Sequence, residues 1–434
     1  MTKNNTVFTS LQLGIGTGTV LLLSKWVASI STLALPESII NYGLLAGILY
    51  AMIGPFTLIL LGILIKKIRS TFPKGESIHD YLSYKLSHKG YIIVCSFLVL
   101  LSIESMFIQT KVASILLNVF FHIPYTLGSF LFITLCTIFV MLSNAKLFTK
   151  MAIMQTVLMF STMIIIPIYF FVQDGITHVY DGIRLYHPYL LFYENINGIY
   201  FLSAGILIET GRVLISPASW DKAFRIHPKK IIPTFLLSGF IWITIPLAFA
   251  SLIMIVIFSG SLDHLYDLLA QLPKKIEFTI LFYLLVIGSL SAIASSFISW
   301  MHGFTKLIQD VIPMIRTKMN PKLHATHFIA IAIGFLAFFI TITTNYTILE
   351  IIFFFGIFYT SLIITILFII FSKQKISIII PLISIIGALT GYAVYFLIDP
   401  LTSIWASITV TLSLSIFYTF SHWIHQQSKY KMKL

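Results

Sequence analysis

Long apolar runs, separated by short polar segments, recur from one end of the chain to the other. Each run has about 18 residues or more, which is enough for an α-helix to cross a hydrocarbon core of roughly 30 Å. The pattern predicts about twelve transmembrane helices, at residues 12–34, 43–65, 91–120, 125–143, 151–173, 195–213, 231–259, 276–304, 325–344, 348–371, 376–397 and 402–424. The predicted fold class is therefore an all-α polytopic membrane protein, with residues 1–434 in a single transmembrane domain.

The composition supports this class and excludes a soluble globular protein. Hydrophobic residues make up 58% of the 434 positions and charged residues 10%, whereas soluble domains have about 25% charged residues. The start, Met1 to Ser10, is polar, and the first apolar run is too long for a cleavable signal peptide. Cys95 and Cys136 both fall in apolar runs, so neither indicates a disulfide framework or a metal site.

The net charge of +13 follows from the distribution of lysine and arginine rather than from a nucleic-acid-binding surface. With both termini in the cytoplasm, 22 of the 28 basic residues fall in cytoplasmic segments and three in external loops. This asymmetry obeys the positive-inside rule and predicts a plasma-membrane protein with cytoplasmic termini. The longest cytoplasmic loop, Lys66 to Lys89, has the composition of a solvated helix on the membrane surface.

The sequence lacks the motifs of common membrane-associated enzymes. It has no Walker motif, dinucleotide-binding fingerprint, zinc-ligand spacing or nucleophile elbow. We therefore expect no enzymatic activity, no organic cofactor and no nucleic-acid partner.

The segment Ser291-Ala-Ile-Ala-Ser-Ser296 places three hydroxyls among small residues inside an apolar run, and Ser299 and His302 follow. Hydroxyls are costly in hydrocarbon unless they face protein, water or an ion. A row of oxygens at this depth is typical of a cation site. It is also typical of a close contact between two helices, because small residues let membrane helices approach each other.

Two pairs of charged residues lie within predicted membrane helices. Glu104 and Lys111 are two turns apart on one face of the third helix, and Glu209 and Arg212 are one turn apart on the sixth, where Gly211 indicates a break. Buried charges in membranes usually pair and often mark substrate or ion pathways. Static pairs that hold the bundle together and contacts to a small polar solute are both open interpretations.

Several segments carry a resemblance to a known family. They are Ser24-Lys-Trp-Val-Ala-Ser-Ile-Ser-Thr-Leu33 continuing to Tyr42-Gly43, a stretch with Lys146, Gln155 and Thr156, Ser219-Trp-Asp-Lys-Ala-Phe-Arg225 followed by Trp242 to Pro246, and Ser291 to Ser296 with Asp310. In this order they resemble the sodium:solute symporter family, and its urea/polyamine active-transporter branch most closely. The resemblance covers about residues 12–371.

The resemblance implies a leucine-transporter-type core of two inverted five-helix repeats. These would be residues 12–173 and 195–371, with two peripheral helices in 376–424. The predicted spans agree, because each set has five spans and the two sets start on opposite sides of the membrane. In such folds, the first and sixth helices are discontinuous and form the substrate site near the middle of the bilayer.

The same resemblance implies one sodium site. The eighth helix would supply the carbonyl of Ala292 and the hydroxyls of Ser295 and Ser296, and the first helix carbonyls near Ser24 and Val27. Sodium is a hard cation and prefers such oxygen ligands. A short alignment gap would move the ligands on the first helix to around Ala28 and Ser31.

Two residues beside this site depart from the family pattern. Other family members carry an acid near Trp26 for a second cation, so we expect one sodium only. Lys25 could replace sodium with a fixed ammonium, giving uniport or proton-coupled transport, or it could reach a cytoplasmic vestibule or the membrane interface. The residues expected to contact the solute are Trp26, Glu104, Glu209, Gly211 and Arg212.

The function predicted from the sequence is sodium-coupled symport of a small polar solute across the plasma membrane by alternating access. A sodium-independent uniporter or channel and a transporter-like sensor are the alternatives, because this fold can serve without active pumping. The expected partners are the solute, Na⁺ and membrane lipid. Urea-like, amine, amino-acid and carboxylate solutes all remain open, and so does the oligomeric state.

Overall fold

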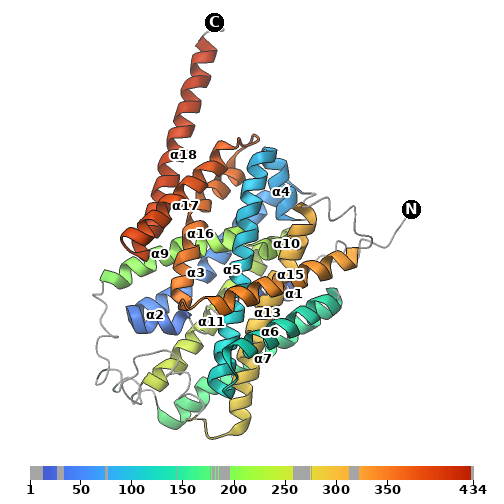
Figure 1. Cartoon of the computed structure of the whole chain (residues 1–434), viewed down its shortest axis with the longest axis vertical. Coiled ribbons are helices and arrows are strands. Elements are labelled where there is room, and N and C mark those ends of the chain that lie inside the picture. Colours follow the sequence, from blue (N-terminus) through green and yellow to red (C-terminus); the bar gives the residue numbers. More distant parts are fainter. Residues whose placement is uncertain are drawn as a thin grey trace.

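The computed structural model is built from α-helices (Figure 1). It describes residues 13–26, 34–73, 77–143, 145–175, 196–257, 276–311 and 322–431, together with the single residues 177, 181, 184 and 274. Within these ranges, the extended contacts are two isolated bridges, Leu13 with Ile226 and Leu86 with Ile376. The helices run α1 (Ile15–Trp26), α2 (Leu35–Tyr42), α3 (Leu44–Thr71), α4 (Ile78–Lys85), α5 (His88–Phe121), α6 (Tyr125–Leu142), α7 (Ala145–Asp174), α9 (Ile196–Ile215), α10 (Pro217–Arg225), α11 (Ile231–Ile257), α13 (Thr279–Val311), α15 (Lys322–Thr343), α16 (Ile348–Phe371), α17 (Ile379–Leu397) and α18 (Pro400–Lys431), with a short 3₁₀ turn at Pro228–Lys230.

Ten helices in the described part of the chain are long and apolar enough to cross a membrane. A further apolar stretch, His327–Thr343, lies in α15. All eleven coincide with predicted spans. The remaining predicted span, residues 12–34, is occupied by α1, which has 12 residues and is too short to cross alone.

The first span is described as two helices, with residues 27–33 between them outside the described residues, and it ends later than predicted. A second helix, α2, extends from Leu35 to Tyr42, a stretch that the hydrophobic pattern assigned to a loop. Helix α2 carries Glu37, Ser38 and Asn41 among its eight residues, so its low hydropathy resembles that of a loop. A proline in the first turn of α2 favours a helix start, because its missing N–H is not needed there.

The sixth span is also discontinuous, but the break is not at Gly211 as predicted. Helix α9 continues through Gly211 to Ile215, and α10 begins at Pro217. Proline has no N–H to donate and its ring clashes with the preceding turn, so the helix ends before Pro217. Gly211 instead allows α9 to approach α16, since a Cβ atom there would lie 2.7 Å from the carbonyl carbon of Tyr359.

The broken helices lie among the long ones. Helix α1 contacts α7, α10, α11 and α13, while α3 packs on α9 and α11, and α16 packs on α9. Helices α17 and α18 pack mainly on each other and on α16, at one side of the bundle, where α18 extends beyond the other helices (Figure 1). The broken ends therefore lie inside the protein.

The short helix α4 lies in the predicted surface loop but is not fully solvated. It begins with a capping box in which Ser77 and Asp80 bind each other's backbone N–H groups. Ile78, Tyr81 and Leu82 are buried, and α4 contacts α5, α10 and α13. One face of this helix thus belongs to the core.

Candidate functional site

The end of α1 meets the serine-rich stretch of α13. The Ser296 hydroxyl donates a 2.8 Å hydrogen bond to the carbonyl oxygen of Lys25, in the last turn of α1. Carbonyls in the last turn of a helix lack intrahelical donors, so they are open to other partners. Ala292, Ser295 and Ser296 are all buried. These residues place oxygen atoms of two helices together inside the protein.

The predicted sodium ligands on α1 are only partly described. Ser24 is buried, and its hydroxyl donates to the carbonyl of Leu21 at 2.9 Å. Val27 and the alternative ligands Ala28 and Ser31 lie outside the described residues. The recorded contact between α1 and the α13 hydroxyls is through the carbonyl of Lys25. The sodium site remains a prediction.

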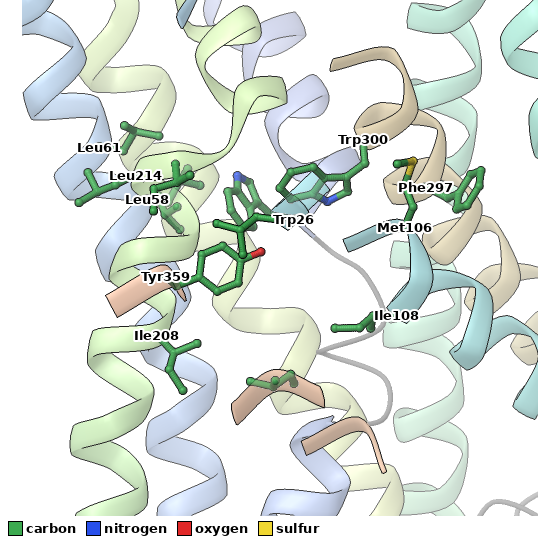
Figure 2. Close-up of a cluster of buried hydrophobic side chains, with 14 of the residues drawn as sticks. Trp26, Leu58, Leu61, Met106, Ile108, Ile208, Leu214, Phe297, Trp300 and Tyr359 are labelled. Carbon is green, nitrogen blue, oxygen red and sulfur yellow. The ribbon is translucent and has the colours of Figure 1, made fainter. Parts of the chain in front are cut away.

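The Lys25 side chain is buried, with 1% of its surface exposed, so it reaches neither a vestibule nor the membrane interface. Its ammonium donates to the hydroxyl of Ser219 at 2.7 Å and to that of Ser216. It also lies 3.6 Å from the ring centroid of Trp26 and 4.2 Å from that of Trp300, two rings that lie close together in Figure 2. Lys25 therefore joins the end of α1 to the break between α9 and α10.

A second lysine, Lys222 on α10, was not predicted to belong to this site. Its ammonium donates to the carbonyl of Leu21 at 2.7 Å and to the hydroxyl of Ser299 at 3.2 Å. The sequence predicts that Lys222 lies among the cytoplasmic charges, whereas in the structure this residue is buried, with 6% of its surface exposed. Lys222 is buried because α10, the second half of the broken sixth span, packs into the core against α1 and α13. The apolar pattern of the sequence does not indicate this packing.

The acidic residues of the site lie on α5 and α9. Glu209 forms an ion pair with Arg212 at 3.5 Å and accepts a hydrogen bond from the Tyr50 hydroxyl at 3.4 Å. Glu104 accepts hydrogen bonds from the hydroxyls of Tyr359 at 2.8 Å and Ser105 at 3.0 Å. In Figure 2 the Tyr359 hydroxyl points to the side of the cluster on which Trp26 and Trp300 lie.

The interpretation of Glu104 and Lys111 as a static pair is wrong. The Lys111 ammonium donates to the carbonyl of Thr344 at 3.2 Å instead. Seven residues along a helix correspond to a rise of roughly 10 Å, which is too far for direct contact even on one face. The pair between Glu209 and Arg212, one turn apart, is confirmed.

Two tryptophans and an arginine near the broken helices have N–H groups without acceptors among the described residues. Trp26 stacks on Trp242 with ring centroids 5.5 Å apart. Nε1 of both rings, and Nε of Arg212, are buried and without a hydrogen-bond partner. A cavity of about 20 Å³ adjoins Trp242 and is lined by Leu35, Tyr50, Ala51, Gly54, Glu209, Trp242 and Pro246. Buried donors usually have partners, so acceptors from outside the protein are expected here.

Ion pairs on Asp221 connect α10 with α13. Asp221 on α10 forms a 2.5 Å ion pair with Arg225 and a second ion pair with Lys306 on α13. The backbone adds two bonds, since the N–H of Leu13 donates to Arg225 at 2.9 Å and that of His227 to Leu13 at 3.3 Å. The start of the first span, the end of α10 and the last turns of α13 are thus held together.

Comparisons of the sequence with protein-family models and with curated proteins find no match. Comparison with solved structures finds a Na⁺-coupled sialic acid symporter in a substrate-bound outward-open state, with a TM-score of 0.72 at 14% identity over 92% of this chain and 88% of that one. It also finds Mhp1, a nucleobase-cation-symport-1 family transporter in a closed conformation with bromovinylhydantoin bound, with a TM-score of 0.64 at 9% identity over 98% and 96% of the two chains. The chain has a leucine-transporter-type fold.

This fold is the one predicted from the sequence. In leucine-transporter-type folds the discontinuous helices bind substrate and ions near the middle of the bilayer. In this chain the two breaks are joined by Lys25 and Ser216. The division into inverted repeats at residues 12–173 and 195–371, and membership in the urea/polyamine branch, stay predictions.

Proposed function

We propose that the chain is a secondary active transporter that moves a small polar solute across the cell membrane by alternating access, driven by sodium. The observation that carries this proposal is the hydrogen bond from Ser296 to the carbonyl of Lys25. It joins the hydroxyl-bearing turn of α13 to the open end of α1, as a site between these helices requires. The fold supports a transporter, and the sodium coupling rests on this contact and on the composition of the site.

The expected sodium ligands are all oxygen atoms. They are the carbonyls of Lys25 and Ala292, the hydroxyls of Ser295 and Ser296, and the carbonyls predicted near Ser24 and Val27. None of these is a carboxylate, so the ion is held by dipoles alone. Binding of this kind is weak enough for release on the other side of the membrane, which transport needs.

The solute is expected to bind beside this ion, between the two breaks. The unpartnered N–H groups of Trp26, Trp242 and Arg212 and the carboxylates of Glu104 and Glu209 offer donors and acceptors there. Gly211 contributes no polar side chain, and its role in the structure is the close approach to Tyr359. We therefore propose the other four predicted contacts, together with Trp242, as the solute-binding residues.

The orientation and the location are part of the proposal. The split of 22 basic residues against three supports cytoplasmic termini. In this orientation, the ion pairs of Asp221 lie on the cytoplasmic side of the site, because α10 leads into the segment with Lys229 and Lys230.

Sodium-independent transport is the second candidate, and Lys222 favours it. Its ammonium donates hydrogen bonds to the carbonyl of Leu21 and to the hydroxyl of Ser299. Ser299 lies one helical turn after Ser295 and Ser296 on α13. A protein-borne cation there already neutralises oxygen atoms that would otherwise attract sodium.

The deciding experiment uses the purified full-length protein in detergent and in proteoliposomes. A thermal-shift screen of a solute library is run in sodium and in potassium, and any solute found is then tested for uptake against its gradient. Sodium-dependent stabilisation and accumulation support the proposal. Accumulation that is equal in sodium and potassium leaves the second candidate, and equilibration without accumulation leaves a uniporter or channel.

A further inference from the structure

Lys25 has no ion-pair partner among the described residues, and its hydrogen bonds go to hydroxyls alone, whereas the buried Lys111 and Lys222 each donate to a carbonyl oxygen. The Lys25 ammonium contacts two hydroxyls and two indole rings, and no carboxylate of the described residues pairs with it. Arg212 has Glu209, and Asp221 has Arg225 and Lys306. A buried charge in a membrane protein is expensive unless a counter-charge balances it.

The position of Lys25 increases the free-energy cost of its unbalanced positive charge. Its ammonium donates a hydrogen bond to the hydroxyl of Ser216, the N-cap residue of α10. The same hydroxyl accepts a hydrogen bond from the N–H of Ser219 at 3.4 Å. The N-terminus of a helix carries a partial positive charge. An ammonium and a helix N-terminus that face each other repel, and an anion between them turns both contacts into favourable ones.

A separate observation also indicates an acceptor from outside the protein. Trp26, next to Lys25 in the chain, is 5% exposed, and its indole N–H has no acceptor among the described residues. The same ring lies 3.6 Å from the Lys25 ammonium. Two donors from adjacent residues therefore lie close together, one charged and one neutral, and a carboxylate has two oxygen atoms that can accept from both.

We propose that the transported solute carries a carboxylate, and that this carboxylate is the missing counter-ion of Lys25. This inference rests on the proposed transport function and names the substrate class of the same site. On binding, the carboxylate replaces the hydroxyls of Ser216 and Ser219 on the ammonium, and it accepts from the indole N–H of Trp26.

The charge of the solute also sets the energetics of transport. One sodium and one monocarboxylate together carry no net charge, so the membrane potential does no work on their movement. A tenfold sodium gradient, equivalent to about 1.4 kcal/mol, then limits accumulation to about tenfold. A neutral solute moving with one sodium would also be driven by the membrane potential, and its accumulation limit at 100 mV would be roughly 500-fold.

The test is a thermal-shift panel on the unaltered full-length protein at constant sodium concentration. The probes are matched pairs of carboxylates and carboxamides, namely acetate and acetamide, lactate and lactamide, and glycine and glycinamide, with chloride and sulfate as inorganic anions and simple amines as cations. We expect stabilisation by one or more carboxylates and none by the paired amides. The comparison of each carboxylate with its paired amide tests the inference without any variant.

Two variants then locate the effect. Lys25→Met removes the charge and keeps the length of the side chain, and we expect it to lose the response to the carboxylate by at least tenfold in affinity. Lys111→Met is the matched control, because Lys111 is also buried but donates to the carbonyl of Thr344. We expect this control to keep the response.

The outcomes separate this inference from the proposed function. Stabilisation and sodium-dependent uptake of amides or amines, with no effect of carboxylates, would overturn the carboxylate assignment and leave the transporter in place. An equal response to chloride would assign the Lys25 position to an inorganic anion and overturn it as well. A protein that responds to no solute and to no sodium would overturn the proposed function itself.

Discussion

The indole N–H of Trp220 donates a 2.7 Å hydrogen bond to the carbonyl of Leu214, across the break between α9 and α10. The residues at the break, Ser216 and Pro217, do not continue the helical ladder. Trp220 is 1% exposed and its ring stacks on Tyr81 of α4, with centroids 5.9 Å apart. One side chain therefore fixes the two halves of the sixth span relative to each other and to helix α4.

Replacing Trp220 by phenylalanine keeps an aromatic ring but removes this donor. We expect a loss of stability of about 1–3 kcal/mol, because the carbonyl of Leu214 is left buried without its partner. Thermal unfolding in detergent measures the effect. Trp405→Phe, at a side chain that is 38% exposed on α18, is the control and should change little. Equal unfolding temperatures for both variants would contradict a structural role for the bond.

Ser295→Ala and Ser296→Ala each remove one hydroxyl that we propose as a sodium ligand, and little volume. A hydrogen bond to a charged group contributes about 1.5–3 kcal/mol, so we expect sodium affinity to fall by roughly 10- to 100-fold in each variant. Sodium titrations followed by thermal shift give the affinity, and membrane abundance shows whether folding is intact.

Ser289→Ala is the matched control for these two variants. Ser289 is buried on the same helix, about two turns before Ser296. We expect its sodium affinity to equal that of the unaltered protein. A fall in affinity of the same size at Ser289 would mean that the substitutions act through the packing of α13 rather than through a ligand.

The transport stoichiometry is expected to be one sodium per solute, since one oxygen-only site is predicted and the family resemblance puts Trp26 where an acid would hold a second ion. Tightly coupled uptake of a neutral solute should then be electrogenic, with accumulation limited to roughly 500-fold at 100 mV and a tenfold sodium gradient. For a monocarboxylate, the same stoichiometry gives electroneutral uptake and a limit of about tenfold. Reversal-potential measurements that give two sodium ions per solute would require a second site, with Glu104 or Glu209 as the first candidates.

The predicted orientation places residues 174–194 outside the cell. A cysteine introduced at Asp181 should react with a membrane-impermeant maleimide in intact cells, and one introduced at Lys373, between α16 and α17, should react only after permeabilisation. Cys95 and Cys136 are both buried, so background labelling should be low. Labelling in the opposite pattern would invert the topology.

The extent of the spans could be predicted because transfer of apolar residues into hydrocarbon depends on composition alone. The position of the breaks could not. Gly211 and Pro217 are both helix-weakening residues within six positions, and only the packing against Tyr359 shows that the glycine serves close contact while the proline ends the helix.

The candidate site was predictable where one helix carries several oxygen atoms, as in Ser291 to Ser296. It was not predictable where distant segments meet. Nothing in the sequence near Lys222 indicates that its ammonium reaches the carbonyl of Leu21, because this contact depends on how α10 packs against α1 and α13. The error for Glu104 and Lys111 has a different cause. The two residues share a helix face, but they lie about two turns apart along the helix axis and cannot touch.

The contact between Lys25 and Ser216 also has a consequence for the assembly of the protein in the membrane. The two residues are 191 positions apart, so the hydroxyl partners of Lys25 are synthesised only after α3, α5, α6, α7 and α9. A lysine at the centre of an isolated membrane helix costs about 2.5–3.5 kcal/mol on insertion. We therefore expect the insertion machinery to hold the first span at a shallow depth while the next helices emerge from the ribosome. Although it is made first, α1 would then be among the last core helices to reach its final depth.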